Sequence, residues 1–198
     1  VVSSIRDAGG AATAVVADTT VEDDVVRLVR EAEAIAPVDV AVFNAGNNMP
    51  GDFLQMEAAY FEKAWRICCF GGFLFARESL RAMAPRERGT LLFTGASASM
   101  RGKPFFAAFT AAKGGLRNLA QSLAREFGPK GVHVGHVVVD GGIAGDRIEK
   151  GLPDFAKSKG EEGLVDLDGI ASLYEMMWRQ PRAAWSHEVD VRTFKESW

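Results

Sequence analysis

Three near-continuous apolar runs constrain the fold of this chain more than any other feature of its sequence. They lie at residues 38–46, 89–97 and 131–142, and aliphatic residues and phenylalanine dominate them. Strands that are apolar on both faces are typical of a parallel sheet covered by helices on both sides. The stretches between the runs carry apolar residues at helical spacing, so strands and helices alternate along the chain.

Two long amphipathic helices are predicted between these strands, at about residues 57–83 and 106–127. In both, apolar residues recur in steps of three and four, which places them on one face of a helix. The stripes are Phe61, Trp65, Cys68, Gly72 and Phe75 in the first helix, and Phe109, Lys113, Leu116, Ala120, Leu123 and Phe127 in the second. A lysine within the second stripe is unusual, because a lone charge on a helix normally faces solvent.

Other elements are predicted toward the two ends of the chain. Residues 11–18 are rich in alanine and valine and end in Asp18, which predicts a strand. Thr19 is then expected to cap a helix, with Glu22 three residues later completing a capping box. The later elements are a helix within 166–180 and a strand within 188–194, after a loop-rich section at 143–163.

Composition narrows the possible functions. The net charge is −3 and no basic cluster is present, which argues against nucleic acid or an anionic membrane as partner. The longest uncharged apolar run, at residues 67–76, is too short to cross a bilayer. The two cysteines, Cys68 and Cys69, are adjacent and poorly placed for a structural disulfide, so we expect a cytoplasmic location.

Small or polar residues follow each predicted strand. Ligands of parallel sheets bind beyond the carboxyl ends of the strands, so these residues predict a ligand crevice along one edge. The strand tips are Asp18, then Asn44, Ala45 and Gly46, then Gly95, Ala96 and Ser97, and finally Asp140, Gly141 and Gly142.

Several of these residues form motifs whose order and spacing resemble the short-chain dehydrogenase/reductase family. They are "AD" and "NAG" after successive strands, "RGKP" at 101–104, Lys113 on the second long helix, and "LAREFGPKGVHV" leading into a strand. The resemblance covers almost the whole chain. It implies one Rossmann-like domain over residues 1–198, an α/β fold with a doubly wound parallel sheet between two helical layers. It also implies an NAD(P)-dependent oxidoreductase acting on a small alcohol or carbonyl compound.

The resemblance assigns a dinucleotide, NAD or NADP, to the crevice, and we expect no metal ion there. By this resemblance Asp18 hydrogen-bonds the adenine with Thr19 beside it, Asn44, Ala45 and Gly46 approach the adenosine ribose, Lys113 holds the nicotinamide ribose, and Gly141, Gly142 and Ile143 flank the carboxamide. Simpler alternatives stay open for each. Asp18 could cap a helix or a turn, the glycines could serve turns only, and Lys113 could be a solvated charge.

The catalytic positions implied by the resemblance are substituted. Phe109 stands where the family has its catalytic tyrosine, Ala96 where it has serine, and Cys68 where it has asparagine, whereas Lys113 is retained. Ser97 and Ser99 are alternative donors, and His133 and His136 are expected to face opposite sides of their strand as core residues. We therefore predict an oxidoreductase with an atypical site. The alternative is a catalytically silent dinucleotide-binding sensor or scaffold subunit.

Partners and chain ends complete the sequence-based expectations. The two long helices suit association into a homodimer or homotetramer, and a small apolar substrate would lie against Phe53, Met100, Phe105, Phe106 and Phe109. The chain begins at Val1 without the strand, glycine-rich turn and helix with which the family begins. We expect the native protein to carry about 40 to 50 further residues upstream, the size of this unit.

Overall fold

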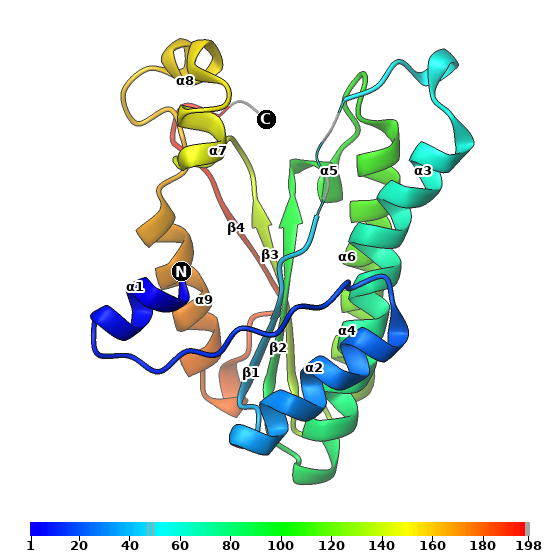
Figure 1. Cartoon of the computed structure of the whole chain (residues 1–198), viewed down its shortest axis with the longest axis vertical. Helices are drawn as coiled ribbons and strands as arrows, with labels where there is room; N and C mark the ends of the chain where they lie inside the picture. Colours follow the sequence, from blue (N-terminus) through cyan, green and yellow to red (C-terminus); the bar gives the residue numbers. More distant parts are fainter. Residues whose placement is uncertain (47, 49, 197–198) are drawn as a thin grey trace.

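One parallel sheet organises the structure, a computed structural model that describes residues 1–46, 48 and 50–196. Its strands are β1 (Val40–Phe43), β2 (Thr90–Ala96), β3 (His133–Val139) and β4 (Glu188–Val191), in the spatial order β1-β2-β3-β4. Each strand pairs in parallel with the next one along the chain. All four carboxyl ends therefore lie at the same edge (Figure 1).

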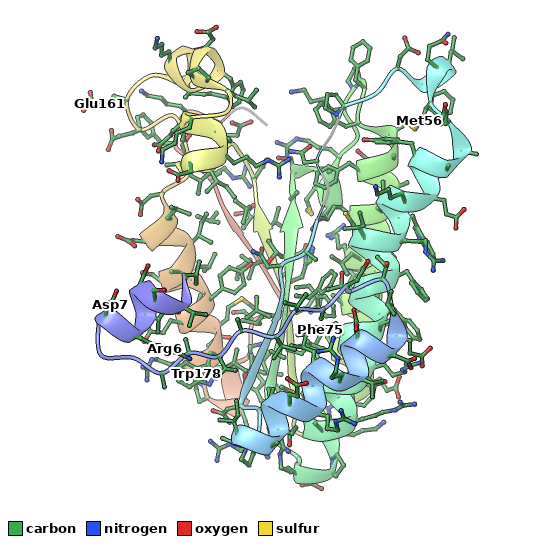
Figure 2. The ribbon with its side chains drawn as sticks, viewed as in Figure 1. Arg6, Asp7, Met56, Phe75, Glu161 and Trp178 are labelled. Carbon is green, nitrogen blue, oxygen red and sulfur yellow. The ribbon has the colours of Figure 1, made fainter. Side chains whose placement is uncertain are left out.

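Helices cover both faces of this sheet (Figure 1). The helices are α1 (Val2–Asp7), α2 (Glu22–Ile35), α3 (Ala58–Trp65), α4 (Gly71–Met83), α5 (Ser97–Met100), α6 (Ala107–Phe127), α7 (Asp146–Glu149), α8 (Pro153–Lys159) and α9 (Leu167–Arg179). α4 and α6 pack on one face, α9 packs on the other, and Phe75 and Trp178 lie on these opposite sides (Figure 2). This arrangement confirms the predicted three-layer α/β/α fold.

Alternating side chains along the strands fill two separate cores. On β2, Leu91 and Phe93 face α4 and α6, where they meet Leu116, whereas Leu92 faces the opposite side and packs near Met177 of α9. All five side chains are fully buried. Two covered faces explain why the strands read as continuous apolar runs rather than as alternating ones.

The first long helix forms with the predicted extent but is interrupted in its middle. α3 passes into a π-helical turn at Arg66–Phe70, which continues directly into α4. Cys68 lies in this turn and is fully buried, whereas Phe61 and Trp65, earlier in the predicted stripe, remain 39% and 40% exposed. π turns inside α-helices occur frequently at functional sites.

Among the described residues, no helix combines the length and apolarity needed to cross a membrane.

The predicted strand at residues 11–18 is wrong. This segment has no regular secondary structure, and Val16 is 91% exposed. A strand requires a neighbour to complete its ladder, and within the described part of the chain none pairs with this segment. Side chains satisfy two of its carbonyl groups instead, because Arg6 donates to the Ala12 oxygen and Arg27 donates to the Val16 oxygen.

The predicted capping box at Thr19 is also wrong. α2 begins at Glu22 after Val21, which has no side chain able to cap it. The side chain of Asp18 instead accepts hydrogen bonds from the amide and the hydroxyl of Thr20, both at 2.8 Å. This local turn competes with the cap and fixes the approach to α2.

Close packing of α4 against α6 yields a stability prediction. A Cβ on Gly72 would lie 2.4 Å from Leu116 and 3.2 Å from Phe43, whereas one on Gly114 would contact nothing. We expect Gly72→Ala to lower the free energy of unfolding by about 1 to 3 kcal/mol through overpacking. Gly114→Ala should raise it by roughly 0.5 to 1 kcal/mol, because alanine favours a helix. Chemical denaturation measures both, and a stabilised Gly72→Ala protein would contradict this packing.

Candidate functional site

Lys113 is the central charged group at the carboxyl edge of the sheet. It projects from α6, is only 4% exposed, and its Nζ donates a 2.7 Å hydrogen bond to the carbonyl oxygen of Thr94 near the end of β2. Burial lowers the pKa of Lys113. Because Lys113 is buried, the alternative of a solvated surface charge is wrong. Burying an ammonium is costly, so the site must provide polar partners for it.

The tip of β1 meets Lys113. A Cβ on Gly46 would lie 3.6 Å from Nζ of Lys113, so the backbone of Gly46 lies directly beside the ammonium. Asn44 and Gly46 are exposed, and Ala45 packs against the core under α4 and α6. The end of β2 and the segment that follows β1 therefore both contact Lys113.

The three substituted positions to which the resemblance assigns catalytic roles lie together. Cys68 from the π turn and Phe109 from α6 form one buried cluster, and Ala96 from the end of β2 packs against it. Phe109 is 8% exposed, and its ring centroid lies 5.9 Å from Nζ of Lys113, within cation–π range. The geometric convergence implied by the resemblance is present, but an aromatic ring replaces the ionisable hydroxyl.

Serine hydroxyls near this cluster are already engaged. Ser97 donates a 2.5 Å hydrogen bond to Oδ1 of Asp140. Ser99 is 6% exposed, and its Oγ accepts the amide hydrogen of Ala96 at 3.1 Å. Ser99 therefore stabilises the start of α5, whereas Ser97 belongs to a charged network.

Asp140 is the centre of that network. It follows β3 directly, is 1% exposed, and receives two hydrogen bonds from Arg101, at 2.8 and 3.0 Å. Burial acts to raise the pKa of Asp140, but the hydrogen bonds from Arg101 and Ser97 outweigh burial, so the pKa is lowered. Arg192, beyond β4, lies 3.8 Å from the same carboxylate. Sequence reasoning missed this network, although Arg101 and Asp140 both belong to segments that it singled out.

The residues after β3 are held closely by the chain that returns toward α9. Gly141 has a φ of +150°, and a Cβ there would lie 3.1 Å from Val165. A Cβ on Gly142 would lie 2.9 Å from Leu164. Ile143 forms a parallel bridge with Val165 and packs on the α9 side of the sheet. Gly141 therefore serves both the turn and the close approach of Val165, whereas Gly142 lies close to the Leu164 side chain.

Asp18 and Thr19 are held by a separate set of contacts. A Cβ on Gly71, at the start of α4, would lie 3.0 Å from the Thr19 carbonyl oxygen. Asp18 is exposed, and the hydrogen bonds from Thr20 lower its pKa. Within this chain, Asp18 caps a turn, which is the simpler of the two roles expected from the sequence.

Apolar residues near the edge differ in exposure. Phe53, Met100 and Phe105 are 68%, 45% and 62% exposed, whereas Phe106 is partly buried and Phe109 is buried. The amide of Gly51 donates to the Phe105 carbonyl oxygen at 2.8 Å, which joins two loops on one side of the edge.

Within residues 1–46, 48 and 50–196, no group of three or more His, Cys, Asp or Glu side chains could hold a metal ion.

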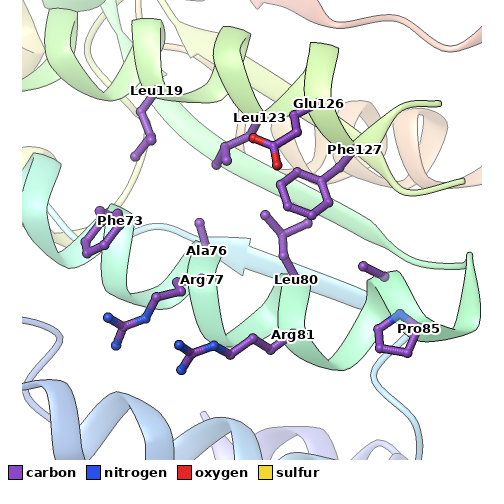
Figure 3. A pocket seen from close by; sticks show the side chains of 11 residues that line it. Phe73, Ala76, Arg77, Leu80, Arg81, Pro85, Leu119, Leu123, Glu126 and Phe127 are labelled. Atoms are coloured by element: carbon purple, nitrogen blue, oxygen red, sulfur yellow. The ribbon is translucent and has the colours of Figure 1, made fainter. Parts of the chain in front are cut away.

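A groove of about 540 Å³ lies elsewhere, between α4 and α6 (Figure 3). Apolar side chains of both helices line it, with charged groups around them. They include Phe73, Leu80, Leu119, Leu123 and Phe127, together with Arg77, Arg81 and Glu126. The groove contains none of the residues at the carboxyl edge, so it is a separate feature of the surface.

Loss of the Asp140 charge should destabilise the protein in a pH-dependent way. We expect Asp140→Asn to lower the free energy of unfolding by about 3 kcal/mol at pH 7, since a buried ion pair loses one partner. A carboxyl group with a lowered pKa stabilises the fold above its unfolded pKa, and this contribution disappears as pH falls through the folded pKa. The wild-type advantage should therefore shrink below about pH 4.

The control for this prediction is Asp39→Asn, since Asp39 forms an exposed ion pair with Arg88. We expect a change within about 0.5 kcal/mol for this variant. Urea denaturation between pH 3 and 7 measures both variants. Equal losses for the two variants would show that the Asp140 network does not stabilise the fold.

Comparison with known proteins agrees with this geometry. The family described as short chain dehydrogenase matches residues 1–149. A short-chain dehydrogenase structure from Rhodopseudomonas palustris has a TM-score of 0.81 and is 35% identical, covering 98% of this chain and 80% of that chain. A metagenomic short-chain oxidoreductase in complex with NADP has a TM-score of 0.79 and is 24% identical, with 98% and 80% covered.

Curated relatives are similar over part of their length. A 30% identical relative is (21S)-21-acetoxyl-apo-melianone synthase of Melia azedarach, matched over 78% of this chain and 60% of that protein. A 32% identical relative is 2-(S)-hydroxypropyl-CoM dehydrogenase 3 of Xanthobacter autotrophicus, matched over 61% and 48%. The chain thus spans less than two thirds of the length of these relatives. With a family match over most of its residues, the chain belongs to the short-chain dehydrogenase family.

Proposed function

We propose that this protein is an NAD(P)-dependent oxidoreductase that acts on the alcohol or carbonyl group of a small, fairly apolar compound. The observation that carries this proposal is the buried ammonium of Lys113 beside Gly46, in contact with the cluster of Cys68 and Phe109. A lysine at the edge where the strands end, with a glycine beside it, is suited to hold sugar hydroxyls. We also propose that the protein is located in the reducing environment of the cytoplasm.

The residues present fit a dinucleotide. An ammonium has three donors, and Thr94 accepts one from Lys113, which leaves donors for ribose hydroxyls. Asp18 uses Oδ1 for both bonds from Thr20, which leaves Oδ2 to accept from an adenine amino group. Gly141, whose φ of +150° favours glycine, lies in the turn after β3 that we assign to the carboxamide, and a short-chain oxidoreductase of this fold forms a complex with NADP. When bound, the nicotinamide supplies the hydride chemistry.

Ser97 is the group that we assign to the substrate oxygen. Its hydrogen is held by the ionised carboxylate of Asp140, so its Oγ lone pairs are available to accept a hydrogen bond from a substrate hydroxyl. Phe109 and Ala96 have no proton to transfer, and their role is to shape the apolar wall with Cys68. Exposed Phe53 and Phe105 extend that wall, which favours a substrate with an apolar body.

A second candidate is a catalytically silent, dinucleotide-binding sensor or scaffold subunit. The buried ring of Phe109 favours it, because general acid catalysis by a tyrosine hydroxyl typically contributes a factor of about 10² to 10⁴ in rate. This candidate shares the coenzyme site with the first and lacks only turnover. Coenzyme binding with no conversion across a panel of alcohols and carbonyl compounds would favour it.

Self-association through α4 and α6 belongs to the same proposal. The groove between them exposes apolar surface, with Phe73 40% exposed, and the charged residues Arg77, Arg81 and Glu126 border it. Such a surface of apolar residues with a charged border is suited to a copy of itself. We propose a homodimer or homotetramer formed through these two helices.

Coenzyme binding tests the first half of the proposal. Calorimetry on the full-length protein should detect binding of NADH or NADPH, and Lys113→Met should weaken it by about tenfold or more, the equivalent of a hydrogen bond to a charged group. The control is Lys130→Met, which lies beyond the opposite, C-terminal end of α6 and has an exposed side chain, and it should bind normally. No heat with either coenzyme would remove both candidate functions.

Restoring the missing hydroxyls tests the second half. We expect Phe109→Tyr combined with Ala96→Ser to raise carbonyl reductase activity by about 10²- to 10⁴-fold, because Lys113 would lower the pKa of the new phenol. Phe127→Tyr, on the same helix stripe but away from the carboxyl edge, should leave activity unchanged. Steady-state rates with a panel of aldehydes and ketones measure the effect. An unchanged rate in the double variant would mean that the cluster is not built for this chemistry.

The oligomeric state is tested separately. Leu123→Arg places a charge in the groove of Figure 3 and should shift the protein toward monomers, since an unpaired charge in an interface is costly. Light scattering after size exclusion measures the mass. Val26→Arg on α2 introduces the same charge at a position that is 37% exposed, outside the groove, and should leave the mass as in the wild type.

A further inference from the structure

A buried histidine on β3 has a role that the proposed reaction does not use. His136 is 0% exposed, and its Nδ1 lies 2.9 Å from Oε2 of Glu188 on β4. Arg117 of α6 donates to both oxygens of that carboxylate at 2.7 Å, so Glu188 is ionised and can only accept. Nδ1 of His136 therefore carries the hydrogen, and Nε2 carries a lone pair.

The position of that lone pair is fixed by Gly95. Nε2 of His136 lies 2.3 Å from the point that a Cβ on Gly95 would occupy, so only glycine admits the ring here. Nε2 is buried and has no hydrogen-bond partner among the described residues. A buried acceptor without a partner is costly, typically by about 1 to 3 kcal/mol, so its retention requires a reason.

Lys113 stands beside the same peptide group. Its Nζ donates to the carbonyl oxygen of Thr94, and that carbonyl is bonded to the nitrogen of Gly95. Nζ of Lys113 and Nε2 of His136 therefore lie within roughly 8 Å of each other by standard backbone dimensions. One atom is a donor with hydrogens to spare, and the other is an acceptor without a partner.

The surroundings of the ring are charged on two sides. α6 contributes Lys113 and Arg117, and β4 contributes Glu188, while Ser99 of α5 has its Oγ 3.1 Å from the same Cβ point of Gly95. Burial lowers the pKa of His136 to about 4, and the charges of Lys113 and Arg117 add to this effect against that of Glu188. The ring is thus neutral and able to accept across the physiological range.

We propose that His136 is a positioning residue for Lys113, accepting at Nε2 a hydrogen bond that reaches it from the Lys113 ammonium through one bridging water. Glu188 and Arg117 hold the ring in the tautomer that makes this possible. The contact offsets the cost of burying the ammonium and keeps it charged and directed at the carboxyl edge. The proposal deepens the proposed function, since it concerns the lysine assigned to the ribose.

Two conservative variants separate this role from simple packing. His136→Gln retains an acceptor near the position of Nε2, whereas His136→Asn retains a group only near Nδ1, within reach of Glu188. We expect His136→Asn to lower the pKa of Lys113 by about 1, and His136→Gln to leave it near the wild-type value. Lysine ¹³Cε and ¹⁵Nζ resonances of the full-length protein without coenzyme, followed from pH 6 to 12, measure that pKa, with Lys113→Met assigning the signal.

His133→Asn is the matched control. His133 is 2% exposed on the same strand, but it faces the other side of the sheet and stacks on Trp185. The His133→Asn substitution should destabilise the fold without changing the pKa of Lys113. An unchanged pKa of Lys113 in His136→Asn, or an equal change in His133→Asn, would overturn the proposal.

A second measurement holds even if His136→Asn does not fold. The ¹⁵Nε2 resonance of His136 should differ between the wild-type protein and the Lys113→Met variant, because the variant lacks the ammonium from which the proposed hydrogen bond reaches Nε2. No movement would also overturn the proposal. Neither measurement uses a coenzyme, so failure of coenzyme binding with these results intact would reject only the proposed function.

Discussion

The hydrogen bond between the Lys113 ammonium and the Thr94 carbonyl is the interaction on which the site depends. It joins α6 to the carboxyl end of β2 inside the protein, with the lysine only 4% exposed. A charge can be kept there only if polar groups surround it. The backbone carbonyl is one such group, the ring of Phe109 lies within cation–π range, and the backbone of Gly46 lies beside the ammonium.

Polar groups at this edge are distributed differently from what the family resemblance implies. Cys68, Ala96 and Phe109 form an apolar cluster at positions where the resemblance implies hydroxyl and amide groups. Ser97 and Arg101 instead converge on the buried carboxylate of Asp140. The charge at this edge is therefore carried by the Asp140 network and by Lys113, and the cluster beside them is apolar.

Much of this arrangement could be predicted from the sequence, for a physical reason. The apolar runs give the strands, and the helical stripes give α4 and α6, because burial on both faces of a sheet leaves a strong periodic signal. Lys113 was recognisable because a charge within an apolar stripe demands a partner. The convergence of Cys68, Ala96 and Phe109 followed from the family resemblance rather than from periodicity.

What escaped prediction depends on pairing between distant residues. Residues 11–18 have the composition of a strand, yet a strand exists only through its neighbour, and side chains such as Arg27 satisfy their carbonyls instead. Asp18 forms a turn with Thr20 because a local hydrogen bond competes with a helix cap. The ion pair of Arg101 with Asp140 joins segments 39 residues apart, and no local pattern encodes it.

The two buried networks on β3 share one structural logic. Asp140 at its end and His136 three residues before the last valine both take a polar group into the interior, and each is fixed by an arginine-supported contact. Such networks are stable only when every member is satisfied, so a single unpartnered atom indicates where another group belongs. Among the described residues, Nε2 of His136 is one such atom, and the donor near it is the lysine that the proposed function requires to stay charged.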